Sequence, residues 1–173
     1  MAERPTQRHF AVMGDNTFKI ANVLMSNQTI CRLLKYQTKD PLELIDPKTG
    51  KSQPDVKGEE LINKQILIVP KIFDDSTEKM SYITAIFDDY VVNTLNPEFK
   101  VSTLRFDIAC PYDEWILNAH TLRPYLIMQQ IDTEFNGRHL SGIGNLQFWR
   151  ADNLTLSPWI GGYSMRYKIN EFN

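Results

Sequence analysis

Three carboxylates on two neighbouring strand-like stretches offer the clearest chemistry in this chain. Asp88 and Asp89 are adjacent in one stretch, and Asp107 follows in the next. Oxygen ligands of this kind are those that Mg²⁺ prefers. Neighbouring residues of a strand point to opposite faces, however, so Asp88 and Asp89 cannot easily share one ion. Because Asp is also disfavoured inside strands, we favour a β-bulge or a solvated strand end at this pair.

A second group of reactive side chains surrounds His120. Cys110, Asp113 and Glu114 lie near it in the sequence, but the other two histidines, His9 and His139, are far away. A zinc site needs three or four converging ligands. The ordinary interpretation is therefore a loop histidine beside surface carboxylates.

Sequence motifs for catalysis are missing. The chain has no GxxxxGK[ST] phosphate loop, no GxSxG elbow, no HExxH and no CxxC. We therefore expect no enzyme activity, no catalytic or metal-binding residue and no cofactor. The alternative from another class is a small metal-dependent hydrolase or nuclease that uses Asp88, Asp89, Asp107 and Glu114.

Composition indicates an ordinary globular domain. The 173 residues are 42% apolar and 23% charged, with a formal net charge of -2. That charge argues against a main task of gripping nucleic-acid backbones, although it allows passing contact with DNA. Residues 1–14 lack the apolar core of a signal peptide, and no run of about eighteen apolar residues exists, so we expect no membrane contact. Cys31 and Cys110 are then predicted to be free, buried thiols.

The first third of the chain predicts helix followed by an irregular excursion. A weakly patterned arm at 1–14 precedes an apolar helical pattern from about 16 to 36, which Ser26 to Thr29 interrupts. Two helices, the second capped by Ser26 or Asn27, are the alternative to one. Residues 40–60 hold three prolines, two glycines and many charges. This stretch is either a surface excursion or an arm that orders on a neighbouring subunit.

The remainder predicts two hairpins around a helix. Strands are expected at 65–72, 81–92, 99–110, 144–151 and 160–169, with a turn at 93–97 and a helix at about 124–135. Pro124 suits the first helical turn, and Gly137 suits the left-handed position past its end. The fold class is thus α+β: a mostly antiparallel sheet with a long β-hairpin, flanked by two or three helices. Residues 15–173 would form a single domain with an extended loop at about 40–60.

Alternation along these strands selects candidate contact residues. Polar side chains share one face of a strand, and aromatic side chains are common interface anchors. The candidate interface residues are Arg105, Asp107, Trp149, Trp159, Tyr163, Arg166 and Lys168. Asp88 and Asp89 are candidates for a channel lining, where acids would keep a passing polyanion from sticking.

Two stretches resemble a known family. The first runs from Trp115–Leu117 through Arg123–Ile127 to Ile131–Asn136, and the second joins LSGIGNLQF (140–148) to WIGGYSMRY (159–167). Together with the order of elements over residues 16–173, they are similar to the tail-terminator and neck proteins of tailed bacteriophages. The second pair looks like the closing hairpin of small phage structural proteins.

The resemblance implies a virion structural protein in the tail or neck, made in the host cytoplasm. Such a subunit forms a homo-oligomeric ring, commonly sixfold, that caps the tail tube and joins it to the head connector while DNA passes through the lumen. The family implies no catalytic residues. A head-closure or tail-tube subunit is the nearest alternative, and a host-directed binding module is a further one.

Overall fold

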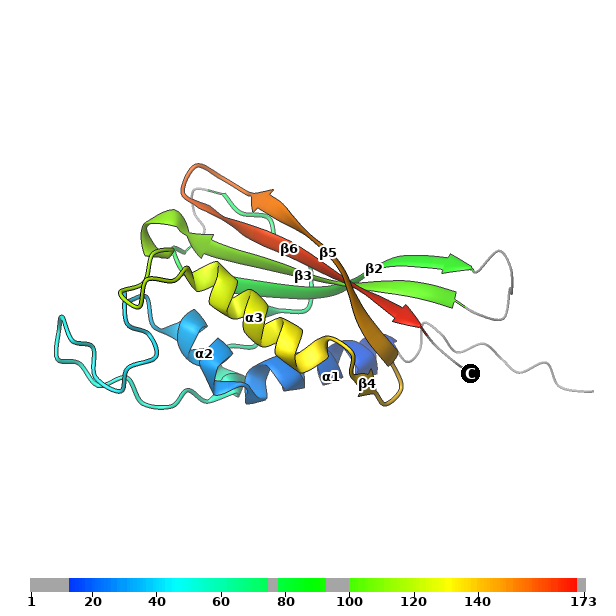
Figure 1. The fold of residues 1–173 in the computed structure, drawn as a ribbon, viewed down its shortest axis with the longest axis horizontal. Coiled ribbons are helices and arrows are strands. Elements are labelled where there is room, and N and C mark those ends of the chain that lie inside the picture. Colours follow the sequence, from blue (N-terminus) through cyan, green and yellow to red (C-terminus); the bar gives the residue numbers. More distant parts are fainter. Residues whose placement is uncertain (1–12, 75–77, 93–99, 171–173) are drawn as a thin grey trace, which may run out of the picture.

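The computed structural model describes residues 13–74, 78–92 and 100–170. Within them the chain forms three helices and a six-stranded sheet in the order β1-β2-β3-β6-β5-β4 (Figure 1). Neighbouring strands are antiparallel, except that β1 and β2 are parallel. The predicted α+β class is confirmed. The predicted arm up to residue 12 and the turn at 93–97 lie outside the described residues.

The elements follow the predicted order. The helices are α1 (Met13–Ser26), α2 (Gln28–Lys35) and α3 (Arg123–Phe135), with 3₁₀ turns at Gly58–Glu60 and Tyr112–Glu114. The strands are β1 (Ile66–Leu67), β2 (Tyr82–Val92), β3 (Lys100–Pro111), β4 (His139–Leu140), β5 (Gly144–Thr155) and β6 (Ile160–Asn170). Both predicted hairpins are confirmed. The short strand β4 was not predicted, and β1 is shorter than the predicted 65–72.

The first helical pattern is divided in two, as the alternative interpretation held. Asn27 caps α2, and its side-chain oxygen accepts a hydrogen bond from the Ile30 N–H at 3.0 Å. Its amide nitrogen donates to Glu134 of α3 at 2.9 Å. Asn27 therefore starts one helix and ties it to another. None of the helices in the described ranges is long and apolar enough to span a membrane.

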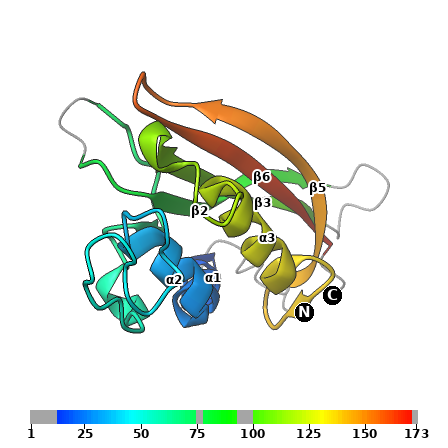
Figure 2. The ribbon, with the colours of Figure 1, turned by 60° about the vertical axis from the view of Figure 1, so that its left-hand side comes forward.

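The helices cover one face of the sheet, here called the inner face (Figures 1 and 2). Alternation along β3 sends Leu104, Phe106, Ile108 and Cys110 into this layer, where all are buried. The Phe106 ring lies 4.8 Å from that of Phe135 on α3. This single apolar layer forms the main core of the protein.

A smaller apolar cluster lies on the opposite, outer face of the sheet. Residues 69–74, here called the strap, follow β1 and bring Phe73 onto the buried ring of Tyr82 at 5.3 Å. Pro70 has no N–H to give to a ladder, which accounts for the early end of β1. The strap therefore covers one end of the outer face.

The Asp40–Glu60 loop packs on α2 of its own chain. The buried Arg32 donates to the backbone carbonyls of Gln53 at 2.7 Å and Glu43 at 2.6 Å. The buried amide of Gln53 donates in turn to the Glu43 carbonyl at 2.9 Å, and Val56 is buried. Hydrogen bonds within one chain therefore anchor this loop, and its contact with a neighbouring subunit stays a prediction.

One buried arginine joins three separate segments. Arg123 is fully buried at the start of α3, and its guanidinium donates to four backbone carbonyls. Three belong to the end of α2 and the residues after it, Leu33, Tyr36 (3.0 Å) and Thr38 (2.6 Å), and the fourth is Glu114 (3.2 Å). Burial lowers the pKa of Arg123. Carbonyls at a helix end attract a cation, so the charge is held without a carboxylate in direct hydrogen-bond contact.

We predict that Arg123→Lys lowers the free energy of unfolding by about 3 kcal/mol, because three ammonium donors cannot reproduce the guanidinium fork. Chemical denaturation measures the change. The matched control is Arg138→Lys, since Arg138 is exposed and pairs with Glu134 one helical turn away. Its expected cost is below about 0.5 kcal/mol. Equal costs at both positions would contradict the role assigned to Arg123.

Candidate functional site

The outer face of the sheet gathers the charged residues predicted from strand alternation. Arg105 of β3 is opposite Arg166 of β6, and Asp107 is opposite Ser164. Because alternate residues share a face, these side chains point away from the helices. The register of the two central strands thus builds one polar surface from residues almost sixty positions apart in the sequence.

These side chains form a continuous network of ion pairs across four strands. Asp88 accepts from Arg105 Nη1 at 2.8 Å and lies 3.5 Å from Arg166 Nε. Arg105 Nε also donates to Asp107 at 3.1 Å, while Arg166 Nη1 donates to Asp152 of β5 at 2.8 Å. The network is compact and largely balanced in charge, with Arg105, Asp88, Asp107 and Arg166 only 18% to 25% exposed.

The paired acids Asp88 and Asp89 lie at a β-bulge, as the sequence predicted. The register between β2 and β3 shifts between Phe87 and Tyr90. The extra residue lets the Asp88 carboxylate reach two arginines, whereas Asp89 is exposed. Asp88 is therefore neutralised by its own chain. The assignment of both acids to a channel lining stays a prediction.

The carboxylates of the alternative hydrolase hypothesis do not converge on a common point. Arg105 lies between Asp88 and Asp107, so a cation at that position would have to displace a guanidinium. Among the described residues, no group of three or more histidine, cysteine or acidic side chains is placed to hold a metal ion.

The group around His120 is also dispersed. Cys110 faces the inner core, and burial raises its pKa to about 12, which leaves little thiolate for nucleophilic attack. His120 lies in a turn with a left-handed backbone (φ 56°). Burial also raises the pKa of Glu114, partly opposed by the Arg123 charge. Glu114 is thus part of the Arg123 environment rather than of a cluster with His120.

Trp149 extends the charged surface with an aromatic ring. It lies at a second bulge, between Phe148 and Arg150 of β5, and is 44% exposed. Lys168 Nζ lies 4.6 Å from the ring centroid and the Arg150 guanidinium 5.1 Å. Five of the seven predicted interface residues therefore share one surface: Arg105, Asp107, Trp149, Arg166 and Lys168.

The other two predicted interface residues lie elsewhere. Trp159 packs against the small apolar cluster beneath the strap. Tyr163 lies on the inner face, where its hydroxyl is 2.8 Å from that of Tyr125 on α3. Alternation within β6 separates Tyr163 from the outer-face group. The assignment of Trp159 and Tyr163 to an interface stays a prediction.

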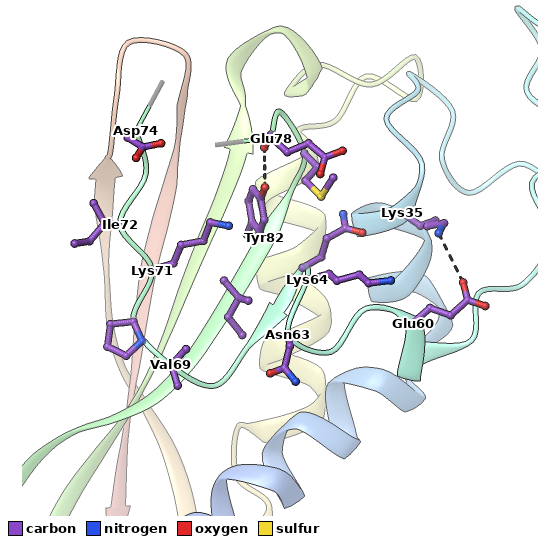
Figure 3. Close-up of a pocket in the computed structure, with 14 residues that line it drawn as sticks. Lys35, Glu60, Asn63, Lys64, Val69, Lys71, Ile72, Asp74, Glu78 and Tyr82 are labelled. Carbon is purple, nitrogen blue, oxygen red and sulfur yellow. Dashed lines mark hydrogen bonds and ion pairs between the residues drawn. The ribbon is translucent and has the colours of Figure 1, made fainter. Parts of the chain in front are cut away.

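A groove that the sequence did not predict lies between the strap and the turn that precedes β1 (Figure 3). It has a volume of about 850 Å³. Val69 and Ile72 project from the strap side, and Lys64 lies on the opposite side. Ile72 is 89% exposed, the largest value among the exposed large apolar side chains of the described residues. Only the isolated apolar residues around Pro70 hinted at this feature.

Long portions of β2 and β5 have no neighbouring described strand on one side, because β1 and β4 beside them are short. On the side of β2 away from β3, β1 pairs only with Ile83 and Thr84, and no described strand lies beside residues 88–92. On the opposite side of the sheet, β4 pairs only with Gly144 and Asn145 of β5. The Phe148 N–H is capped by the side chain of Asn136 at 3.0 Å, and no described strand follows beyond it. Unpaired backbone groups of this kind are templates for another strand.

Comparison with known families finds one match. A model of the family YomW matches residues 27–169, which include α2, α3 and the described sheet except for Asn170, the last residue of β6. The family is phage-associated, of the SPβ type. No curated protein and no solved structure matches the chain.

We predict that Arg166→Gln lowers the free energy of unfolding by about 1–2 kcal/mol, since it leaves Asp88 and Asp152 with one cationic partner each. Salt weakens partly exposed ion pairs, so the difference from the unaltered protein should shrink in 1 M NaCl. Chemical denaturation at both salt concentrations measures it. Lys168→Gln serves as control, because Lys168 contacts the Trp149 ring and pairs with no carboxylate of residues 13–74, 78–92 or 100–170. A loss that does not depend on salt would contradict the electrostatic interpretation.

Proposed function

Because the chain belongs to the phage-associated YomW family, we propose that it is a structural protein of a phage particle. Specifically, it forms the ring that terminates the tail tube, or an adjacent ring of the neck. Copies of the chain join head to tail, one face of the ring meets the tail tube protein and the other meets the head connector. DNA passes through the lumen.

The observation that carries this proposal is the pair of open strand edges on opposite sides of one sheet. A head-to-tail contact needs two different complementary surfaces on each subunit, and it closes into a ring when the rotation per subunit allows. Residues 88–92 of β2 supply one edge, and residues 149–155 of β5 supply the other. Strand addition across them would continue the sheet from one subunit to the next.

The charge balance of the outer-face network supports a surface that DNA can pass without being bound tightly. The three acids Asp88, Asp107 and Asp152 are balanced by three arginines, Arg105, Arg166 and Arg150, the last of which lies 3.1 Å from Asp152. The network therefore presents no large positive field. Tight binding of nucleic acid depends on a positive electrostatic field and on the release of counterions from the phosphates. A subunit that DNA slides past benefits from its absence.

The same edges would serve a head-closure or tail-tube subunit, which is the second candidate. An enzymatic role has less support, because Arg105 occupies the position between the two acids that a metal would need. A binding module directed at the host has no specific feature in its favour.

Cross-linking tests the ring directly. The variant Asp89→Cys/Asn153→Cys carries one new thiol on each open strand, and both positions are exposed. A short bismaleimide should convert concentrated protein into a ladder of covalent oligomers that ends at the ring size. The native thiols should not react, because both are buried with a raised pKa, about 11 for Cys31 and about 12 for Cys110.

Two kinds of control variant show whether the ladder needs a thiol on each open edge. Either single variant can form only dimers. Gln129→Cys/Asn153→Cys moves one thiol to the exposed surface of α3 and should also stop at dimers. No species beyond a dimer from the edge variant, at any concentration up to about 1 mM, would contradict assembly through these edges.

A further inference from the structure

The apolar tip of the Asp40–Glu60 loop has no partner within the described chain. Leu42, Leu44 and Ile45 are 44%, 68% and 60% exposed. The exposure of these side chains does not come from an unanchored loop, because hydrogen bonds from Arg32 and Gln53 hold the adjoining backbone. Three apolar side chains on an anchored loop are typical of a contact surface.

The tip also carries a negative charge. Glu43 stands between Leu42 and Leu44, and its side chain forms no ion pair among the described residues. Asp46, which ends the segment, is buried and bonds its own turn through Thr49 at 2.6 Å. The segment Leu42–Asp46, here called the knob, therefore presents three apolar side chains and one acidic side chain, that of Glu43.

The groove between the strap and the turn before β1 offers the complementary pattern (Figure 3). Val69 and Ile72 make one wall apolar and exposed. Across from them, Lys64 is exposed and has no carboxylate partner in the described part of the chain, whereas Lys35 is paired with Glu60 at 3.7 Å. The groove thus combines an apolar wall with an exposed cation, Lys64. Lys71 also lines it, but its ammonium lies over the Tyr82 ring at 4.3 Å, and the acidic side chains Asp74 and Glu78 line the groove as well.

We propose that the knob of one copy of the chain docks in the groove of a second copy. Leu44 and Ile45 would cover Val69 and Ile72, and Glu43 would meet Lys64. The apolar contact gains free energy in proportion to the area removed from water, and the charge pair sets the orientation. Because knob and groove are different surfaces, the contact is head to tail.

This inference rests on the proposed assembly and adds a second point of contact to it. Strand addition alone specifies backbone pairing but tolerates slippage in register. A side-chain contact at a separate place fixes the angle between subunits, and several modest contacts per copy multiply in a closed ring.

Charge reversal and its rescue test the contact. Sedimentation velocity over a concentration series gives the midpoint of assembly. Glu43→Lys and Lys64→Glu should each raise that midpoint at least about threefold, because each places like charges together. The double variant Glu43→Lys/Lys64→Glu restores opposite charges and should return the midpoint to within about twofold of the unaltered protein. Leu44→Asp should raise it more than about tenfold.

The control is Lys51→Glu, an equal charge change on an exposed loop residue outside the knob. It should leave the midpoint unchanged. All these positions are exposed, so the variants should fold normally, which circular dichroism and melting temperature verify.

Each outcome either supports or overturns the contact between knob and groove. Rescue in the double variant supports the contact. Additive loss in the double variant, or no effect of Leu44→Asp, overturns it, while an edge-to-edge cross-linking ladder would leave the ring itself standing. A chain that stays monomeric in both experiments overturns the ring and the knob contact together.

Discussion

The pairing of β3 with β6 is the constraint on which the rest of this structure depends. It runs without a bulge from Val101 opposite Asn170 to Pro111 opposite Ile160. This one ladder joins the two hairpins into a single sheet. A slip of one residue would move the apolar side chains of β6 to the charged face. With this register, the apolar residues of β3 and β6 face the helices and the ion-paired residues face the outer side. The same pairing places β2 and β5 on either side of the central pair, towards the two ends of the sheet.

Much of this arrangement could be predicted from local patterns. Alternation identified both hairpins, Pro124 and Gly137 marked the ends of α3, and the disfavoured Asp88-Asp89 pair marked a bulge. Alternation also selected Arg105, Asp107 and Arg166 of the outer-face network, but it did not select Asp152. These features depend on neighbours in the sequence or on the period of a strand, which a single sequence displays.

What could not be predicted depends on contacts between distant segments. Arg123 looked like an ordinary helix start, yet it holds carbonyls from residues some ninety positions earlier. The loop at 40–60 looked irregular, yet side-chain hydrogen bonds from Arg32 of α2 and from its own Gln53 hold its backbone. The groove beside the strap follows from the crossing of residues 69–74 to the outer face. The spacing of apolar residues along a sequence does not show which distant segments pack together.

The central claim is that copies of this chain continue one another's sheet across the open edges of β2 and β5. Hydrogen–deuterium exchange at low and high protein concentration tests it most directly. The account predicts that the edge-facing amides of residues 88–92 and 149–155, which alternate along each strand, gain strong protection only when the protein assembles. The amides of the β3–β6 ladder should be protected in both states. Edge amides that exchange equally fast in assembled and dilute protein would contradict it.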